Sequence, residues 1–174
     1  MCEQKSKLNE HLIEDLLTYL PNVYQICMGF TKNPSDAEDL TQEVFMRAHR
    51  KLTSLRRVES SKQWIIQITR NTCLNYIRRQ KIIRFFPINQ FDQPLEDRTP
   101  ETTLINKEQR KAFKNAVEEL PLKWREVFIL REYGHMSYEE IASLLQTKKG
   151  TIMSRLNRAR NVVLEKLGEI HEQK

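Results

Sequence analysis

Apolar residues recur at intervals of three and four along most of this 174-residue chain, which is the spacing of one face of an α-helix. The chain has only four glycines and six prolines, so it is poor in turn formers and rich in residues that favour helices. The first apolar stripe comprises Leu12, Leu16, Leu20, Val23, Cys27 and Phe30. These features predict an all-α fold.

Breaks in the pattern predict a first small helical domain over residues 1–84. Pro21 is expected to end or kink the first helix, because proline lacks the N–H that a helix interior needs. Ser35 and Glu38 form an S-x-x-E capping box, which predicts that a second helix opens there and runs to about Leu52.

The remainder of the chain is predicted to hold a third helix, a linker and a second domain. Ser60 or Ser61 can cap the third helix, whose apolar positions include Trp64, Ile65, Ile68, Leu74 and Ile77. Residues 85–107 contain three prolines and no sustained period, which predicts a flexible linker. Residues 108–174 are predicted to form a second small domain of helices, the first of them starting at about residue 108.

Residues 137–163 have the pattern of a helix-turn-helix. Ser137 and Glu140 form another capping box, and Gln146 lies at the turn, where a left-handed conformation costs about 1 kcal/mol or more. The core stripe of the next helix is predicted to be Ile152, Leu156, Ala159 and Val163. The polar residues of that helix then point outward. This layout predicts a DNA recognition helix, and the alternative is an ordinary helical hairpin with a basic face.

The positive charge of the chain is concentrated in two stretches. The chain carries 29 basic and 23 acidic residues, a net charge of +6. Glu59 is the only acid between Arg56 and Arg84, and no acid lies between Glu140 and Glu165. We interpret these stretches as two separate surfaces that face a polyanion. Nucleic acid is the leading partner class. The alternative is that these charges only solvate helix faces.

The sequence offers little support for metal, redox or catalytic chemistry. Its three cysteines form no CxxC and its four histidines are scattered, so we expect neither a disulfide framework nor a zinc site. We expect Cys27 and Cys73 to act as small core residues. A magnesium-dependent enzyme would need converging acids. The side chains of Asp36, Glu38, Asp39 and Glu43 instead radiate around a helix. We predict no enzyme activity, no catalytic residue, no metal and no cofactor.

The location of the protein is predicted from two absences in the sequence. No apolar run approaches the ~18 residues of a membrane span. The first ten residues are polar and unlike a signal peptide. We therefore expect a cytoplasmic protein without direct membrane insertion.

Five sequence segments occur in an order that resembles a known family. They are DAEDLTQEVF (36–45), WIIQITRN (64–71), NYIRR (75–79), SYEEIA (137–142) and KGTIMSRLNRAR (149–160). From about Leu12 to Leu167 the chain resembles bacterial extracytoplasmic-function (ECF) sigma factors, which belong to the sigma-70 family of RNA polymerase subunits. The resemblance implies that the first domain reads and opens the minus-ten promoter element. It implies that the second domain reads the minus-thirty-five element.

The resemblance implies a docking surface for core RNA polymerase on the second predicted helix. The positions that match the family's contacts with the clamp helices of the polymerase largest subunit are Asp39, Gln42 and Glu43. Their i, i+3 and i+4 spacing places them on one helix face, where carboxylates and an amide suit Arg and Gln on a partner helix. The alternative is an ordinary solvated acidic face, since acids are favourable in the first turn of a helix.

The resemblance also implies which residues contact the minus-ten element: Arg56, Arg57, Ser60, Ser61, Lys62, Asn71, Asn75, Arg78 and Arg79. The last four lie on one polar stripe, which suits the backbone of a separated strand. Position 75 is commonly Asp in the family, and the loop from Arg56 to Gln63 corresponds to the family loop that captures a flipped base. Trp64 is expected to pack in the core rather than stack on a base.

The residues implied for the minus-thirty-five element are Lys148, Lys149, Thr151, Met153, Ser154, Arg155, Asn157 and Arg158. Met153 stands where the family usually has Lys or Arg, which predicts a different promoter preference. The partners implied are promoter DNA, core polymerase, including the flap of its second-largest subunit, and a cognate anti-sigma factor, often membrane-anchored. The alternative function is a stand-alone helix-turn-helix regulator. Such a regulator predicts a ligand domain or a dimerisation helix, and residues 12–84 show no pattern of either.

Overall fold

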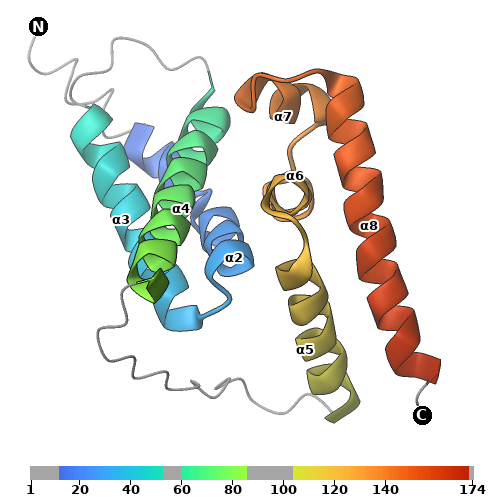
Figure 1. Ribbon diagram of the computed structural model, residues 1–174. Helices are drawn as coiled ribbons and strands as arrows, with labels where there is room; N and C mark the ends of the chain where they lie inside the picture. Colours follow the sequence, from blue (N-terminus) through green and yellow to red (C-terminus); the bar gives the residue numbers. More distant parts are fainter. Residues whose placement is uncertain (1–11, 53–59, 86–103, 173–174) are drawn as a thin grey trace, which may run out of the picture. The chain divides into compact units, whose positions relative to one another are not determined.

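The computed structural model describes residues 12–52, 60–85 and 104–172. The chain divides into two compact units, Met1–Gln90 and Phe91–Lys174. Within the described ranges the regular structure is helical and contains no strand (Figure 1). The all-α prediction with two helical domains is confirmed. Residues 86–103 of the predicted linker, and Arg56 and Arg57 of the predicted minus-ten surface, lie outside the described residues.

The predicted break near Pro21 is confirmed. Residues 12–17 are helical, and a new helix, α2, spans Leu20–Thr31 with the proline in its first turn. The first N–H groups of a helix have no partner within it, so proline costs nothing there and its fixed φ suits the helix. The chain therefore changes direction at Thr18 and Tyr19 instead of continuing one long helix.

Helix α3 spans Pro34–Leu52, and its cap differs from the prediction. The Ser35 backbone N–H donates to Oδ1 of Asn33 over 2.9 Å, so Asn33 provides the cap and Ser35 lies inside the helix. The predicted capping box of Ser35 and Glu38 is wrong. The reason is that Pro34 is preorganised for the first helical position, which shifts the start of the helix towards Asn33.

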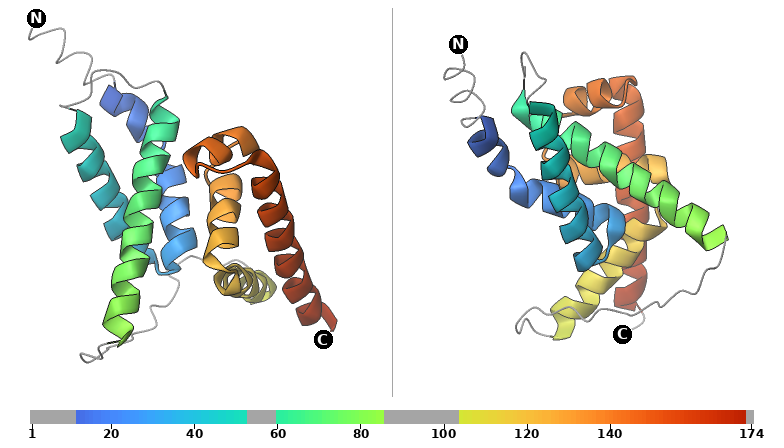
Figure 2. Two further views of the ribbon diagram at one scale, coloured as in Figure 1. Left: turned by 45° about the horizontal axis from the view of Figure 1, so that its top comes forward. Right: turned by 90° about the vertical axis from the view of Figure 1, so that its left-hand side faces the viewer.

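Helix α4 spans Ser61–Phe85 and begins as one of the two predicted alternatives. Ser60 is its cap, because its Oγ accepts a hydrogen bond from the Gln63 backbone N–H at 3.4 Å. The helix packs against both α2 and α3, as the two further views also show (Figure 2).

The buried face of α4 is broader than the apolar pattern predicted. Its buried residues are Ile65, Ile66, Ile68, Thr69, Thr72 and Cys73. The expected core positions Trp64, Leu74 and Ile77 are only half-buried. The two threonines are tolerated inside because each hydroxyl donates to the carbonyl four residues earlier, at 2.8 and 2.9 Å.

The two central cysteines are core residues, as predicted. Cys27 on α2 and Cys73 on α4 are free and fully buried, with 3.7 Å between their sulfur atoms. The contact with Cys27 and burial raise the pKa of Cys73 well above its ordinary value. Cys73 is therefore a protonated, unreactive thiol that fills space between two helices.

The second unit consists of α5 (Leu104–Glu119), α6 (Leu122–Glu132), α7 (Tyr138–Leu144) and α8 (Lys149–Glu172). Helix α8 packs against the other three helices. Helix α5 begins earlier than the predicted start at about residue 108, within the stretch predicted to be linker. The sequence from Leu104 to Lys107 contains neither proline nor glycine, so nothing in it ends a helix.

Candidate nucleic-acid interface and docking surface

Helix α7 and the turn after it are built by local hydrogen bonds. The Glu140 backbone N–H donates to Ser137 Oγ at 3.2 Å, and the Ser137 N–H donates to Glu140 Oε2 at 2.6 Å, so this predicted capping box is confirmed. At the other end, Gln146 has a φ of 49°, the left-handed conformation considered for the turn. The Thr147 N–H donates to the Ala142 carbonyl at 2.9 Å, which closes the turn and offsets the strain.

The candidate DNA-contacting residues of α8 lie opposite its buried stripe, as predicted. Its core stripe of Ile152, Leu156, Ala159 and Val163 is buried. This burial turns the opposite face of the helix to solvent. The candidate minus-thirty-five residues on that face are exposed at Lys148, Lys149, Met153, Ser154, Asn157 and Arg158, and half-buried at Thr151 and Arg155. The structure therefore brings the whole predicted set together at the start of α8: Lys148 directly precedes the helix, and the other seven residues lie in its N-terminal half.

Three cations in the N-terminal half of this helix contact residues that the sequence analysis missed. Lys149 forms an ion pair with Glu139 of α7, and the hydrogen bond from Lys149 lowers the pKa of that carboxyl. Arg160 donates to Glu132 of α6 at 2.7 Å. The guanidinium carbon of Arg158 lies 5.8 Å from the ring centroid of Trp124, also on α6. No local periodicity relates these partners to α8, because they come from other helices.

The polar stripe of α4 faces solvent. Asn71, Arg78 and Arg79 are exposed and Asn75 is half-buried. Hydrogen bonds along the helix connect Arg78 Nη1 to Asn75 Oδ1 at 3.5 Å and Arg70 Nη1 to Asn71 Oδ1 at 3.2 Å. The other candidates on this side, Ser60, Ser61 and Lys62, are half-buried at the start of α4, and the exposed residues Gln63 and Gln67 extend the stripe. The spacing of four residues before Asn71 would have identified Gln67.

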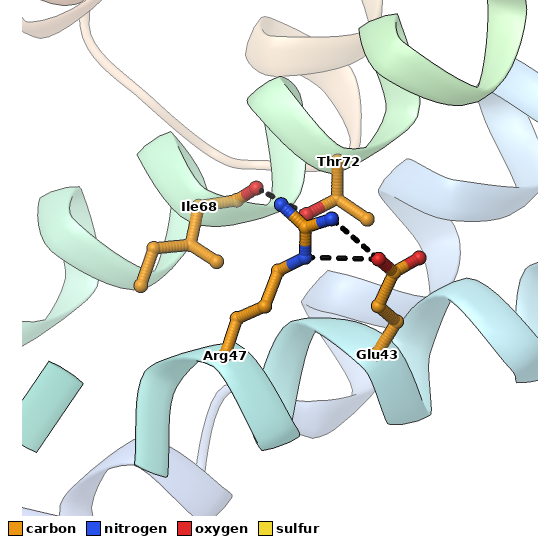
Figure 3. A network of polar contacts seen from close by, with 4 residues as sticks. All are labelled: Glu43, Arg47, Ile68 and Thr72. Atoms are coloured by element: carbon orange, nitrogen blue, oxygen red, sulfur yellow. Dashed lines mark hydrogen bonds and ion pairs between the residues drawn. The ribbon is translucent and has the colours of Figure 1, made fainter. Parts of the chain in front are cut away.

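The predicted docking residues on α3 differ in their surroundings. Asp39 and Gln42 are exposed, whereas Glu43 is half-buried. Arg47 donates from Nε and Nη2 to one Glu43 oxygen, at 2.9 and 2.5 Å (Figure 3). The figure places this pair beside Thr72 and Ile68 of α4. Glu43 therefore lies at the edge of the contact between α3 and α4, where it is paired with Arg47. The side chains of Asp39 and Gln42 are exposed to solvent.

An apolar groove of about 670 Å³ adjoins these docking residues. Gln42 lines the groove, so the groove and the predicted docking residues form one continuous surface. Three of its apolar side chains are unusually open to water, Leu17 at 50%, Leu20 at 45% and Met46 at 49% exposure. A groove with such side chains is typical of a surface that another protein covers.

The acids of α3 do not converge on a common point. Asp36 Oδ2 accepts a hydrogen bond from Tyr76 at 2.7 Å, and Glu43 is paired with Arg47. Within residues 12–52, 60–85 and 104–172, no three His, Cys, Asp or Glu side chains form a group suited to a metal ion. Among the helices in those same ranges, none has the length and apolar character to cross a membrane.

Two helical units, the second with a helix-turn-helix whose exposed face is basic, define a DNA-binding protein. Comparison with protein families identifies the kind of DNA-binding protein. The model for sigma-70 region 2 matches residues 16–82, and the model for sigma-70 region 4 matches residues 110–161. The chain belongs to the sigma-70 family and is a sigma factor of the ECF type.

Individual relatives agree with this family assignment. The ECF RNA polymerase sigma-E factor of Escherichia coli (strain K12) is 31% identical over 76% of this chain and 74% of its own length. The ECF sigma factor SigE of Mycolicibacterium smegmatis is 32% identical over 84% of this chain, which spans 58% of that protein. Sigma factors direct transcription, and the matches do not favour the alternative of a stand-alone regulator.

Solved structures show the same fold. The sigma factor RpoE of Bartonella quintana, solved with the anti-sigma factor NepR, is 28% identical with a TM-score of 0.73, covering 89% of this chain and 95% of its own. The structure of CnrH with the cytosolic domain of CnrY has a TM-score of 0.62 at 19% identity, covering 99% of this chain and 95% of its own. The second likeness concerns the fold alone.

Proposed function

We propose that this chain binds the core of bacterial RNA polymerase and directs it to promoters through two DNA-facing surfaces, one in each unit. The observation that carries the proposal is that each unit has its own exposed polar surface within a segment matching a sigma-70 region. Residues 1–84 would act on the minus-ten element, residues 108–174 on the minus-thirty-five element, and residues 85–107 would connect them. The protein would work in the cytoplasm, where polymerase and promoter meet.

The docking step rests on α3. Gln42 lines the apolar groove, and Asp39, one turn before it, is also exposed, so a partner helix that carries Arg and apolar residues could contact the carboxylate, the amide and the groove together. The clamp helices of the polymerase largest subunit are the proposed partner, and the flap of the second-largest subunit is the proposed partner of the other unit. Glu43 would contribute through its pair with Arg47, which holds its carboxylate in place.

The DNA steps require binding energy and no bond chemistry, so no enzymatic activity is proposed. Asn71, Arg78 and Arg79 form an exposed stripe along which a separated strand can run. On α8, Arg158 and Asn157 are placed to read base edges, and Lys148 and Lys149 to contact phosphates. A cognate anti-sigma factor is proposed as a further partner, because the similar RpoE was solved in complex with NepR.

Run-off transcription tests the proposed function directly. Purified bacterial core polymerase is given a randomised promoter library with and without the full-length protein. We expect protein-dependent transcripts whose templates share two elements at a constant spacing. Failure of the core to bind the protein or to initiate, combined with a retained shift of duplex DNA, would instead establish a stand-alone regulator.

Glu139 is expected to weaken DNA binding, because its carboxylate competes with phosphate for Lys149. The Glu139 carboxyl is ionised at neutral pH, and its pKa, lowered by the hydrogen bond from Lys149, keeps it ionised further into the acid range. Glu139→Gln should tighten binding of the full-length protein to duplex DNA by about two- to threefold, as expected for an exposed ion pair. Fluorescence anisotropy measures the change, and Glu165→Gln, which removes an exposed acid from α8 instead of α7, serves as the control. Equal affinities for the wild type and Glu139→Gln would contradict the competition.

A further inference from the structure

Trp124 holds an unusual place in α6. Residues 126–130 of this helix are all buried, whereas Trp124 precedes them in the first turn and is half-buried. Its indole ring lies 5.8 Å from the guanidinium carbon of Arg158, and α6 packs against α8. A large aromatic side chain therefore contacts an exposed residue of the candidate DNA surface at the margin of the core.

The contact differs in kind from those of the other partnered cations on α8. Lys149 and Arg160 are held by carboxylates, which occupy N–H donors and offset positive charge. An aromatic ring attracts a guanidinium through the ring face, a cation–π interaction. It leaves the N–H donors at the edge of the guanidinium available for hydrogen bonds. Arg158 therefore retains both its charge and its planar fork of donors.

We propose that Trp124 is a positioning residue that presents the Arg158 guanidinium to a base edge of the minus-thirty-five element. Stacking on the ring and a two-point hydrogen bond to a base use different parts of the guanidinium, so both contacts can exist at once. A side chain already held in place loses less freedom on binding than a free arginine does. The inference rests on the proposed function and deepens it, because it adds a specificity-determining residue outside the recognition helix.

The test compares full-length variants on the minus-thirty-five element selected by run-off transcription, on each single base-pair change of that element, and on unrelated duplex DNA. Arg158→Ala should lose discrimination at one base pair by about 5- to 150-fold, the range for a two-point base contact. Trp124→Leu should lose about 3- to 10-fold at the same base pair, as expected for a partly exposed cation–π contact. Its affinity for unrelated DNA should remain unchanged, and Trp124→Tyr, which keeps a ring face, should preserve discrimination.

A double variant separates positioning from packing. In the Arg158→Ala background, Trp124→Leu should cause no additional loss at that base pair. Three results would overturn the proposal. Trp124→Leu could weaken binding equally at every base pair, or could keep full discrimination. It could also cause the same loss in the Arg158→Ala background as in the wild type. Melting followed by circular dichroism verifies folding, and Trp124→Met, whose unbranched side chain adapts to irregular gaps and has no ring, provides the same comparison if Trp124→Leu does not fold.

The outcomes also separate this inference from the proposed function. A wild-type protein that selects no promoter in run-off transcription would overturn both. A wild-type protein that selects a promoter while Trp124→Leu keeps full discrimination would overturn only the positioning role.

Discussion

Asp39→Lys is expected to abolish stable association of the protein with core RNA polymerase, with at least a ~100-fold loss of affinity. Asp39 is exposed on α3, one turn before Gln42, which lines the apolar groove, so its substitution leaves the core of the first unit untouched. In the complex, the new lysine would face the basic partner that the carboxylate is proposed to meet. Gel filtration of the core with labelled protein, followed by competition against the wild type, measures the loss.

The surroundings of Glu43 make Asp39 the sharper test of docking. Glu43 is paired with Arg47 against α4, so Glu43→Lys would place two cations together and mix folding with docking. Glu165→Lys makes the same charge change at an exposed position on α8 and should leave core binding intact. Binding of Asp39→Lys to a minus-thirty-five duplex should match the wild type. Wild-type core affinity in Asp39→Lys would remove α3 from the docking surface.

Leu156→Ala is expected to destabilise the second unit by about 2–5 kcal/mol. Leu156 is fully buried on α8, the helix that packs against α5, α6 and α7, so its truncation leaves a cavity at the centre of that unit. The total stability of a small domain is about 5–15 kcal/mol, which makes this a large fraction. In a Trp64→Phe background, Trp124 is the remaining tryptophan and reports unfolding of this unit in urea.

Leu164 supplies the matched control for this prediction. It lies two turns further along α8 and is 66% exposed, so Leu164→Ala removes the same atoms from a side chain that is mostly in water. Its effect should stay within about 0.5 kcal/mol. Similar destabilisation by the two substitutions would mean that α8 does not pack through the Ile152 and Leu156 stripe.

Elements whose signals are local were predictable from the sequence. The spacing from Ile152 to Val163 identified the buried face of α8, and hence its exposed face, because a helix repeats every 3.6 residues whatever its surroundings. The Ser137 capping box and the break at Pro21 depend on neighbours along the chain and were also predictable. The order of five local motifs was enough to indicate the family.

Predictions that depended on competing local signals or on packing partners were less accurate. Asn33 and Ser35 are both suitable caps, and Pro34 decided between them. The buried face of α4 was misjudged because that helix has two neighbours, α2 and α3, and because Thr69 and Thr72 satisfy their hydroxyls inside the helix. An apolar count cannot detect buried polar residues of this kind.

The helical fold, the division into two units and the family were predictable from the sequence alone. How the candidate residues are partnered depends on the tertiary fold. Glu139 holds Lys149, Trp124 lies under Arg158, and Tyr76 ties α4 to Asp36 on α3. Helical periodicity and capping depend on residues a few positions apart in the sequence. The partner of an exposed charge, in contrast, is any side chain that the packing of the helices brings close to it.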